Sequence, residues 1–266
     1  MQHFLNLDNF PIDRPDSHDY RALVAKCKDE LVRDGMYNLH GFMRPEMARK
    51  VASDLTPKME TDSFTHKRSH NIYFSKSIPD LAVEHPALQL RDTINHTLCA
   101  DQIENSPIIK IYQYTPLVRF LAETMGKPRL YTMDDPLARV NVMSYYEGEA
   151  LNWHFDRSEF TTTLLLRAPS GGGAFEYRSD LRSDDHPNYD GVARLLNGDD
   201  PDVRQISLSE GTLNVFRGRN TAHRVTPIES GTSRMITVFS YYDQPGVQFS
   251  SEERIGFFGR DGVEQV

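Results

Sequence analysis

The sequence predicts a single domain in which a helical N-terminal layer packs on a core of antiparallel β-strands. The first half of the chain places apolar residues at helical spacing, whereas the second half contains short segments rich in β-branched and aromatic residues. Glycine, proline, asparagine and aspartate separate these segments, which is typical of a β-sandwich or barrel. The 266 residues fit one large domain or two small ones, and we favour one because no internal repeat is present.

Helical patterns dominate residues 1–135. Ser17 is placed to cap a helix over residues 20–34, and Gly35 follows as its stop signal. Pro45 opens a second helix, because the first helical turn tolerates proline. The pattern predicts these further elements: helices over residues 87–99 and 116–125, and a strand or loop over residues 63–77.

Strand patterns dominate residues 136–246. The expected strands are residues 139–148, 159–169, 173–179, 203–209, 212–218 and 234–243. A long polar insertion covers residues 178–202, with a short helix expected over 191–196. The last segment, residues 247–266, is expected to be a C-terminal tail.

Composition limits the classes of function. The chain has 30 Lys and Arg against 38 Asp and Glu, a net charge of −8, which argues against a nucleic-acid or anionic-membrane binder. Cys27 and Cys99 form no CxxC pattern, so a reducing, cytoplasmic location is expected. We find neither a signal-peptide pattern at the start nor an apolar run of transmembrane length. The composition does not exclude a small acidic ligand, and the oligomeric state is left open.

The segment NWHFDRSEF contains a candidate metal site. His154 and Asp156 are two residues apart, so on a strand an imidazole and a carboxylate point to the same side. About one H-x-D is expected by chance in a chain with this many histidines, so the pair taken alone is better explained as a surface His beside a solvated Asp.

Two downstream residues make the pattern more specific. His223 follows a predicted strand, and Arg234 begins the next one. Two histidines and one carboxylate form the triad that leaves adjacent positions open on Fe(II). An arginine offers a planar fork that binds a carboxylate through two hydrogen bonds.

These features together resemble the Fe(II)/2-oxoglutarate-dependent dioxygenases. Residues 139–243 match the family's order of strand, H-x-D, apolar strand, Gly-rich turn, second His and Arg. Residues 29–55 resemble its N-terminal region of helix, short strand and helix. The resemblance implies a mostly β fold with α-helices, built on a double-stranded β-helix (jelly roll). It also implies His154, Asp156 and His223 as iron ligands and Arg234 as the partner of the 2-oxoglutarate carboxylate.

Residues 152–166 and 216–227 resemble, more narrowly, the branch of free amino-acid halogenases and hydroxylases. Halogenases of that branch carry Gly where hydroxylases keep Asp, and this chain keeps Asp156. The resemblance therefore implies hydroxylation of a free amino acid with Fe(II), 2-oxoglutarate and O2, releasing succinate and CO2. Desaturation, cyclisation, halogenation and a carrier-tethered substrate stay open, as does a non-catalytic cupin-like binding protein.

Other polar residues near these motifs are candidates for binding, and for each of them packing or solvation is the alternative. The candidates for 2-oxoglutarate are Asn141, Tyr145 and Thr163. The candidates for substrate are Arg68, Asn71, Trp153, Arg157, Arg217 and Asn220. A locally cationic pocket is expected from Arg157, Arg217, Arg219, Arg224 and Arg234.

Overall fold

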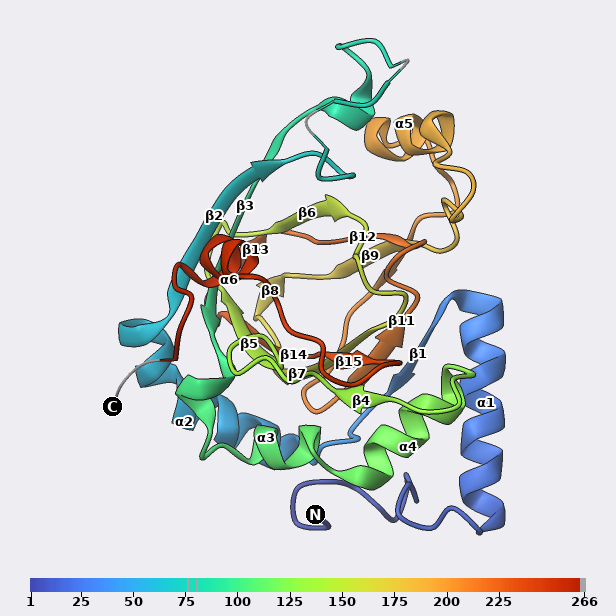
Figure 1. The fold of residues 1–266 in the computed structure, drawn as a ribbon, viewed down its shortest axis with the longest axis vertical. Coiled ribbons are helices and arrows are strands. Elements are labelled where there is room, and N and C mark those ends of the chain that lie inside the picture. Colours follow the sequence, from blue (N-terminus) through green and yellow to red (C-terminus); the bar gives the residue numbers. More distant parts are fainter. Residues whose placement is uncertain (76, 80, 264–266) are drawn as a thin grey trace.

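Two antiparallel β-sheets face each other and form a jelly-roll barrel with helices along one side (Figure 1). The computed structural model describes residues 1–75, 77–79 and 81–263. The mostly β fold confirms the predicted fold class. None of the helices in this described part of the chain is long and apolar enough to span a bilayer.

The bounds of the elements are as follows. The helices are α1 (His18–Asp34), α2 (Pro45–Asp62), α3 (Pro107–Tyr112), α4 (Thr115–Thr124), α5 (Tyr189–Asn197) and α6 (Ser251–Phe258), with short 3-10 turns at Pro86–Leu88 and Ala100–Ile103. The strands are β1 (Met36–Leu39), β2 (Phe64–His70), β3 (Arg91–Leu98), β4 (Tyr131–Thr132), β5 (Val140–Tyr145), β6 (Leu151–His154), β7 (Thr161–Arg167), β8 (Gly171–Gly172), β9 (Phe175–Arg178), β10 (Arg204–Ile206), β11 (Leu213–Phe216), β12 (Ala222–Val225), β13 (Ile228–Ser230), β14 (Arg234–Phe239) and β15 (Tyr241–Tyr242).

The larger sheet separates the main core from the barrel interior. Its strand order is β1-β11-β7-β14-β5-β3-β2, and the smaller sheet has the order β10-β9-β12-β6. Side chains alternate between the two faces of a strand, so Val142 and Met235 join the core shared with α1 to α4. Their neighbours Asn141 and Arg234 lie on the opposite face, which faces the smaller sheet.

Local signals at the helix ends agree with the structure. The Ser17 hydroxyl accepts a hydrogen bond from Tyr20 N, and Gly35 ends α1 in the left-handed conformation. Pro45 is the first residue of α2, and α4 and α5 lie where helical spacing predicts them. These elements depend on short-range patterns, which is why the sequence alone locates them.

The helix expected over residues 87–99 is wrong, because most of this segment is strand β3. β3 pairs with β2 along its length, and Thr93, Asn95 and Thr97 are buried on one face. Alternating β-branched and polar residues suit a sheet, and the partner strand is supplied by tertiary structure rather than by local spacing. β1, β2 and β3 all belong to the larger sheet, so the N-terminal part builds the barrel as well as covering it.

The segment expected to be a C-terminal tail contains helix α6, which contacts the barrel through Asp135. The last residues of that segment, 264–266, lie outside the described part of the chain. The buried carboxylate of Asp135 accepts hydrogen bonds from the backbone N–H groups of Leu137, Ala138 and Phe249. It also pairs with Arg254 of α6 at 2.8 Å. Burial alone would raise the pKa of Asp135, but these hydrogen bonds outweigh it and lower the pKa.

Asp135→Ala should lower the free energy of unfolding by about 3 kcal/mol, because it removes one partner of a buried ion pair. Since the folded-state pKa is lowered, the contribution is present above the pKa of an unfolded aspartate, about 4, and is lost as the pH falls. Urea denaturation of both proteins at neutral and acidic pH measures the difference. Asp54→Ala is the control, because the exposed Lys50–Asp54 pair should contribute little. Equal stability of D135A and wild type would contradict the prediction.

Candidate metal centre

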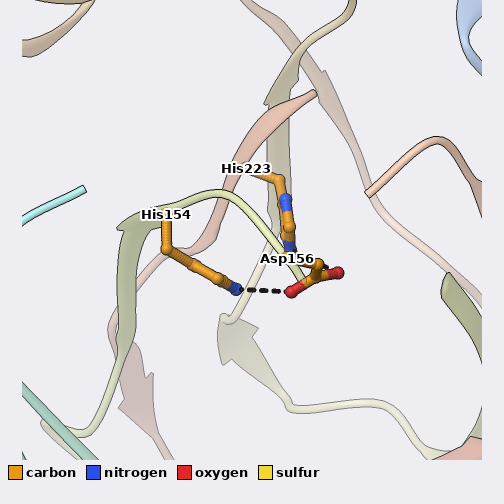
Figure 2. Close-up of side chains that lie close together, drawn as sticks. All are labelled: His154, Asp156 and His223. Atoms are coloured by element: carbon orange, nitrogen blue, oxygen red, sulfur yellow. Dashed lines mark ion pairs between the residues drawn. The ribbon is translucent and has the colours of Figure 1, made fainter. Parts of the chain in front are cut away.

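The metal centre is built where two neighbouring strands of the smaller sheet meet. His154 is the last residue of β6, and His223 lies directly opposite it on β12 (Figure 2). Asp156 follows β6 by two residues, and its carboxylate turns back between the two imidazoles. The structure therefore brings together the three residues predicted as metal ligands.

The geometry of the three side chains suits one metal ion. One ligand atom from each lies within 4.8 Å of the others. Asp156 Oδ1 is 3.3 Å from His154 Nε2, and Asp156 Oδ2 is 3.5 Å from His223 Nε2. Each imidazole donates its Nδ1–H to a backbone carbonyl, His154 to Asn152 at 2.8 Å and His223 to Thr221 at 3.0 Å. The Nε2 lone pairs are therefore available for a metal.

Protonation states in the folded protein also suit metal binding. Burial lowers the pKa of His223 to about 4, so its imidazole is neutral at neutral pH. Burial would raise the pKa of Asp156, but His223 and His154 hold it well below its usual range. A neutral imidazole and an ionised carboxylate are the forms that bind a metal.

Thr161 holds the carboxylate of Asp156 in place, a role that the sequence does not reveal. Its hydroxyl donates to Asp156 Oδ2 at 2.5 Å from the start of β7. Gly218 lies close to both groups, since a Cβ there would be 2.5 Å from the Thr161 hydroxyl and 2.6 Å from Asp156 Oδ2. A glycine is thus required for the close packing around the carboxylate.

Thr161→Val should weaken metal binding about tenfold, because partners that orient a ligand typically contribute 10- to 100-fold in affinity. Calorimetric titration of the purified protein with Ni(II), without 2-oxoglutarate, measures the change. Thr163→Val is the matched control: Thr163 lies on the same face of β7, but its hydroxyl donates to Asn214 at 3.5 Å. Wild-type affinity in T161V, or equal weakening in T163V, would contradict the role of Thr161.

Arg234 is a buried cation on the barrel-facing side of the larger sheet. Its side chain is 3% exposed, and no acidic residue among those described lies within ion-pair distance. Burial lowers its pKa to about 10, which still leaves the guanidinium charged at neutral pH. It lies 6.0 Å from the ring of Tyr145, its neighbour across β5 and β14. An unpaired buried cation is costly unless an anion joins it.

The other candidates for 2-oxoglutarate share this face. Tyr145 is 1% exposed and lies beside Arg234, and Thr163 is 7% exposed on β7. Asn141 also faces the barrel, but its amide donates to Leu137 O at 3.0 Å, near the end of the strand. Tyr145 and Thr163 are therefore the better placed of the three.

Two of the substrate candidates have structural tasks. Trp153 lies on the face of β6 opposite to His154 and packs with Phe155 in a cluster that includes Val192 of α5. Asn71 organises the turn after β2, because its Oδ1 accepts from Tyr73 N and Ser75 N while its Nδ2 donates to Ser75 O. Its 3% exposure leaves little of the side chain accessible to a ligand.

The cationic pocket expected around the metal is smaller than the sequence suggests, because most of its arginines pair with acids. The pairs are Arg157–Glu253, Arg217–Asp180, Arg219–Asp184 and Arg224–Glu176. The sequence could not predict them because most of the partners lie far away along the chain. Arg234 is the member of the expected set without such a partner in the described chain.

Asn220 lies three residues before His223 and has an unused acceptor. Its Oδ1 is buried and has no hydrogen-bond partner among the described residues. A buried polar atom without a partner is uncommon, and it is costly unless a ligand or water pairs with it.

Arg68 supplies a second cation close to the metal centre. Its guanidinium lies 4.4 Å from the ring centre of Phe74, and that ring is 6.0 Å from the ring of His154. The ring of His70 stacks on the ring of Phe74, with 4.5 Å between their centres. Phe74 has a φ of 54°, a strained conformation of the kind found at functional sites. Phe74 and His70 were not among the predicted binding residues.

Comparison with known families assigns the chain. The family model described as Halogenase D matches residues 20–253. The chain belongs to the Halogenase D family. Its family match spans both the N-terminal helices and the barrel, including all three candidate metal ligands. No curated protein matches this member of the Halogenase D family significantly.

Solved structures share the fold of this Halogenase D family member at low sequence identity. AviO1 from Streptomyces viridochromogenes is 16% identical with a TM-score of 0.56, covering 84% of this chain and 96% of its own. A 2OG-Fe(II) oxygenase family protein from Burkholderia pseudomallei is 13% identical with a TM-score of 0.52, covering 84% and 92%. HygX from Streptomyces hygroscopicus, with nickel and 2-oxoglutarate bound, is 12% identical with a TM-score of 0.55, covering 81% and 85%. The fold is therefore that of the Fe(II)/2-oxoglutarate oxygenases, as the sequence resemblance predicts.

Proposed function

We propose that this protein is an Fe(II)/2-oxoglutarate-dependent hydroxylase whose substrate is a free amino acid. The observation that carries the proposal is the group of two buried histidines, His154 and His223, around the partly buried carboxylate of Asp156. Iron bound there, with 2-oxoglutarate and O2, would supply the oxidant that converts an aliphatic C–H to C–OH, with release of succinate and CO2.

Different residues of the chain would bind the metal ion and the 2-oxoglutarate. Two imidazoles and one carboxylate would hold Fe(II) and leave adjacent positions for other ligands. Arg234 would neutralise the distal carboxylate of 2-oxoglutarate, with Tyr145 and Thr163 beside it. HygX, which shares this fold, was solved with nickel and 2-oxoglutarate bound, which supports the assignment.

Two side chains with a buried polar atom that lacks a partner among the described residues support an amino acid as the substrate. The half-buried guanidinium of Arg68 suits a carboxylate, and the buried Asn220 Oδ1 suits an ammonium group. Arg157 and Arg217 are weaker candidates because each pairs with an acid. These contacts would fix the position of the carbon that is oxidised.

A screen of free amino acids tests the proposal. The purified protein is incubated with Fe(II), 2-oxoglutarate, O2 and one amino acid at a time, and succinate and product mass are measured. We expect one amino acid to stimulate succinate formation and to gain one oxygen atom. Full turnover in a folded His154→Ala variant would refute the metal assignment. The absence of stimulation by any free amino acid would refute the substrate class and leave a carrier-tethered substrate.

Halogenation is the second candidate, because the matched family is described as Halogenase D. The retained Asp156 argues against it, since the carboxylate would occupy the iron position that a halide needs. Repeating the screen with added chloride separates the outcomes. A product in which chlorine replaces hydrogen would favour halogenation, and the loss of two hydrogens would indicate desaturation or cyclisation.

A further inference from the structure

The C-terminal helix α6 contacts both segments that flank the metal centre. α6 lies against β2 (Figure 1), and its Phe257 ring lies 5.6 Å from the guanidinium carbon of Arg68. The same ring lies 5.5 Å from the guanidinium carbon of Arg157, which directly follows the ligand Asp156. It also stacks on His66 of β2 at 6.1 Å. One aromatic ring thus connects α6, β2 and the metal-binding loop.

The two arginines at Phe257 differ in how their charges are compensated. Arg157 is paired with Glu253 of α6. For Arg68 no acid among the described residues lies within ion-pair distance, and its Nε is buried without a hydrogen-bond partner. Arg68 therefore depends on aromatic faces, Phe74 at 4.4 Å and Phe257, for its position. Its charge remains available for an anion.

Several interactions fix the position of helix α6, which carries the Phe257 ring. Ser250 and Glu253 form a capping box at its start, and Arg254 pairs with the buried Asp135. Phe258, the next residue after Phe257, is 6% exposed and packs in the cluster that contains Met133. Phe257 packs against the same cluster, with its ring 5.6 Å from that of Phe249, and it also contacts the two arginines.

We propose that Phe257 is a positioning residue that holds the Arg68 guanidinium against Phe74, so that α6 forms one wall of the substrate site. This rests on the proposed function, in which Arg68 binds the substrate carboxylate. The family match ends at residue 253, so Phe257 lies outside the matched segment. Phe257 acts through Arg68 and need not touch the substrate.

Phe257→Leu tests the proposal, because it keeps an apolar side chain but removes the aromatic face. Phe257→Tyr keeps the aromatic face and should therefore behave as wild type. Phe258→Leu is the matched control, an identical change at the neighbouring position with no guanidinium contact. The first measurement is the rate at which phenylglyoxal modifies Arg68, followed by peptide mass spectrometry, with the exposed Arg49 as internal reference.

We expect F257L to raise the rate of Arg68 modification at least threefold, with wild-type rates in F257Y and F258L. For the amino acid selected by the screen, F257L should raise KM about 3- to 10-fold, the range of one cation–π contact. Two other properties of F257L should stay within about twofold of wild type, namely kcat and the affinity of the Ni(II) form for 2-oxoglutarate. The reason is that, in this proposal, Arg68 contacts neither the metal ion nor 2-oxoglutarate.

Wild-type labelling of Arg68 in F257L would overturn the proposal, as would equal effects of F257L and F258L. A fall in kcat without a change in KM would also overturn it, because a general structural defect would then be the cause. The proposed function fails separately, when no amino acid stimulates succinate formation. Arg68 labelling needs no substrate, so it decides the role of Phe257 in either case.

Discussion

His223→Ala should abolish metal binding and, with it, turnover. The substitution removes a buried ligand whose Nδ1–H is fixed by Thr221 O and whose Nε2 faces Asp156. We expect affinity for Ni(II) to fall more than about 100-fold, because even residues that only orient a ligand contribute 10- to 100-fold. Calorimetric titration measures the affinity, and thermal unfolding with and without Ni(II) gives a second readout, since a ligand that binds only the folded state raises Tm.

His70→Gln is the control for this experiment. His70 is also buried, and its ring lies 6.4 Å from the ring of His154, but its two nitrogens bond Asn71 O and the Thr93 hydroxyl. H70Q should bind Ni(II) with nearly wild-type affinity. A Tm of H223A that still rises with Ni(II) as in wild type would mean that the ion binds elsewhere, and the metal centre would have to be reassigned.

Arg234→Met should have opposite effects on ligand affinity and on stability. Removing one partner of a buried charge pair costs about 3 kcal/mol, so affinity for 2-oxoglutarate should fall more than about 100-fold. Without ligand, however, Arg234 is a buried cation with no acid beside it in the described part of the chain, and an apolar side chain of similar length avoids its desolvation. The free energy of unfolding of the ligand-free protein should therefore stay equal or rise.

Arg167→Met gives the reverse pattern and serves as the control. The Arg167 guanidinium bonds Ser233 O at 3.0 Å and the Thr56 hydroxyl at 3.1 Å, so its loss should lower stability. Affinity for 2-oxoglutarate, measured by calorimetry on the Ni(II) form, should be unchanged in R167M. Wild-type affinity for 2-oxoglutarate in R234M would contradict the role of Arg234.

The candidate metal ligands could be predicted from sequence because their chemistry depends on residue type and short spacing. His154 and Asp156 lie two residues apart at the end of a strand, and the positions of His223 and Arg234 match a known order. Helix caps at Ser17 and Gly35 were predictable for the same reason. In each case the physical cause lies within a few residues of the feature.

Features that depend on distant partners were missed. β3 was expected to be a helix because its partner β2 is not visible in local spacing. Arg157 looked free because Glu253 lies far along the chain, and the expected tail contains the helix that carries Phe257. The sequence pattern therefore located the candidate metal centre, whereas the surroundings of that centre follow from tertiary packing.

The position of His154 directly opposite His223 also affects the motions of the barrel. An ion held by both residues acts as a reversible cross-link between β6, an edge strand, and β12 beside it. The two strands cannot separate without releasing the ion, so their backbone amides should exchange with deuterium more slowly when Ni(II) is bound. Amides of α1, which packs on the far side of the larger sheet, should exchange at the same rate with and without the ion.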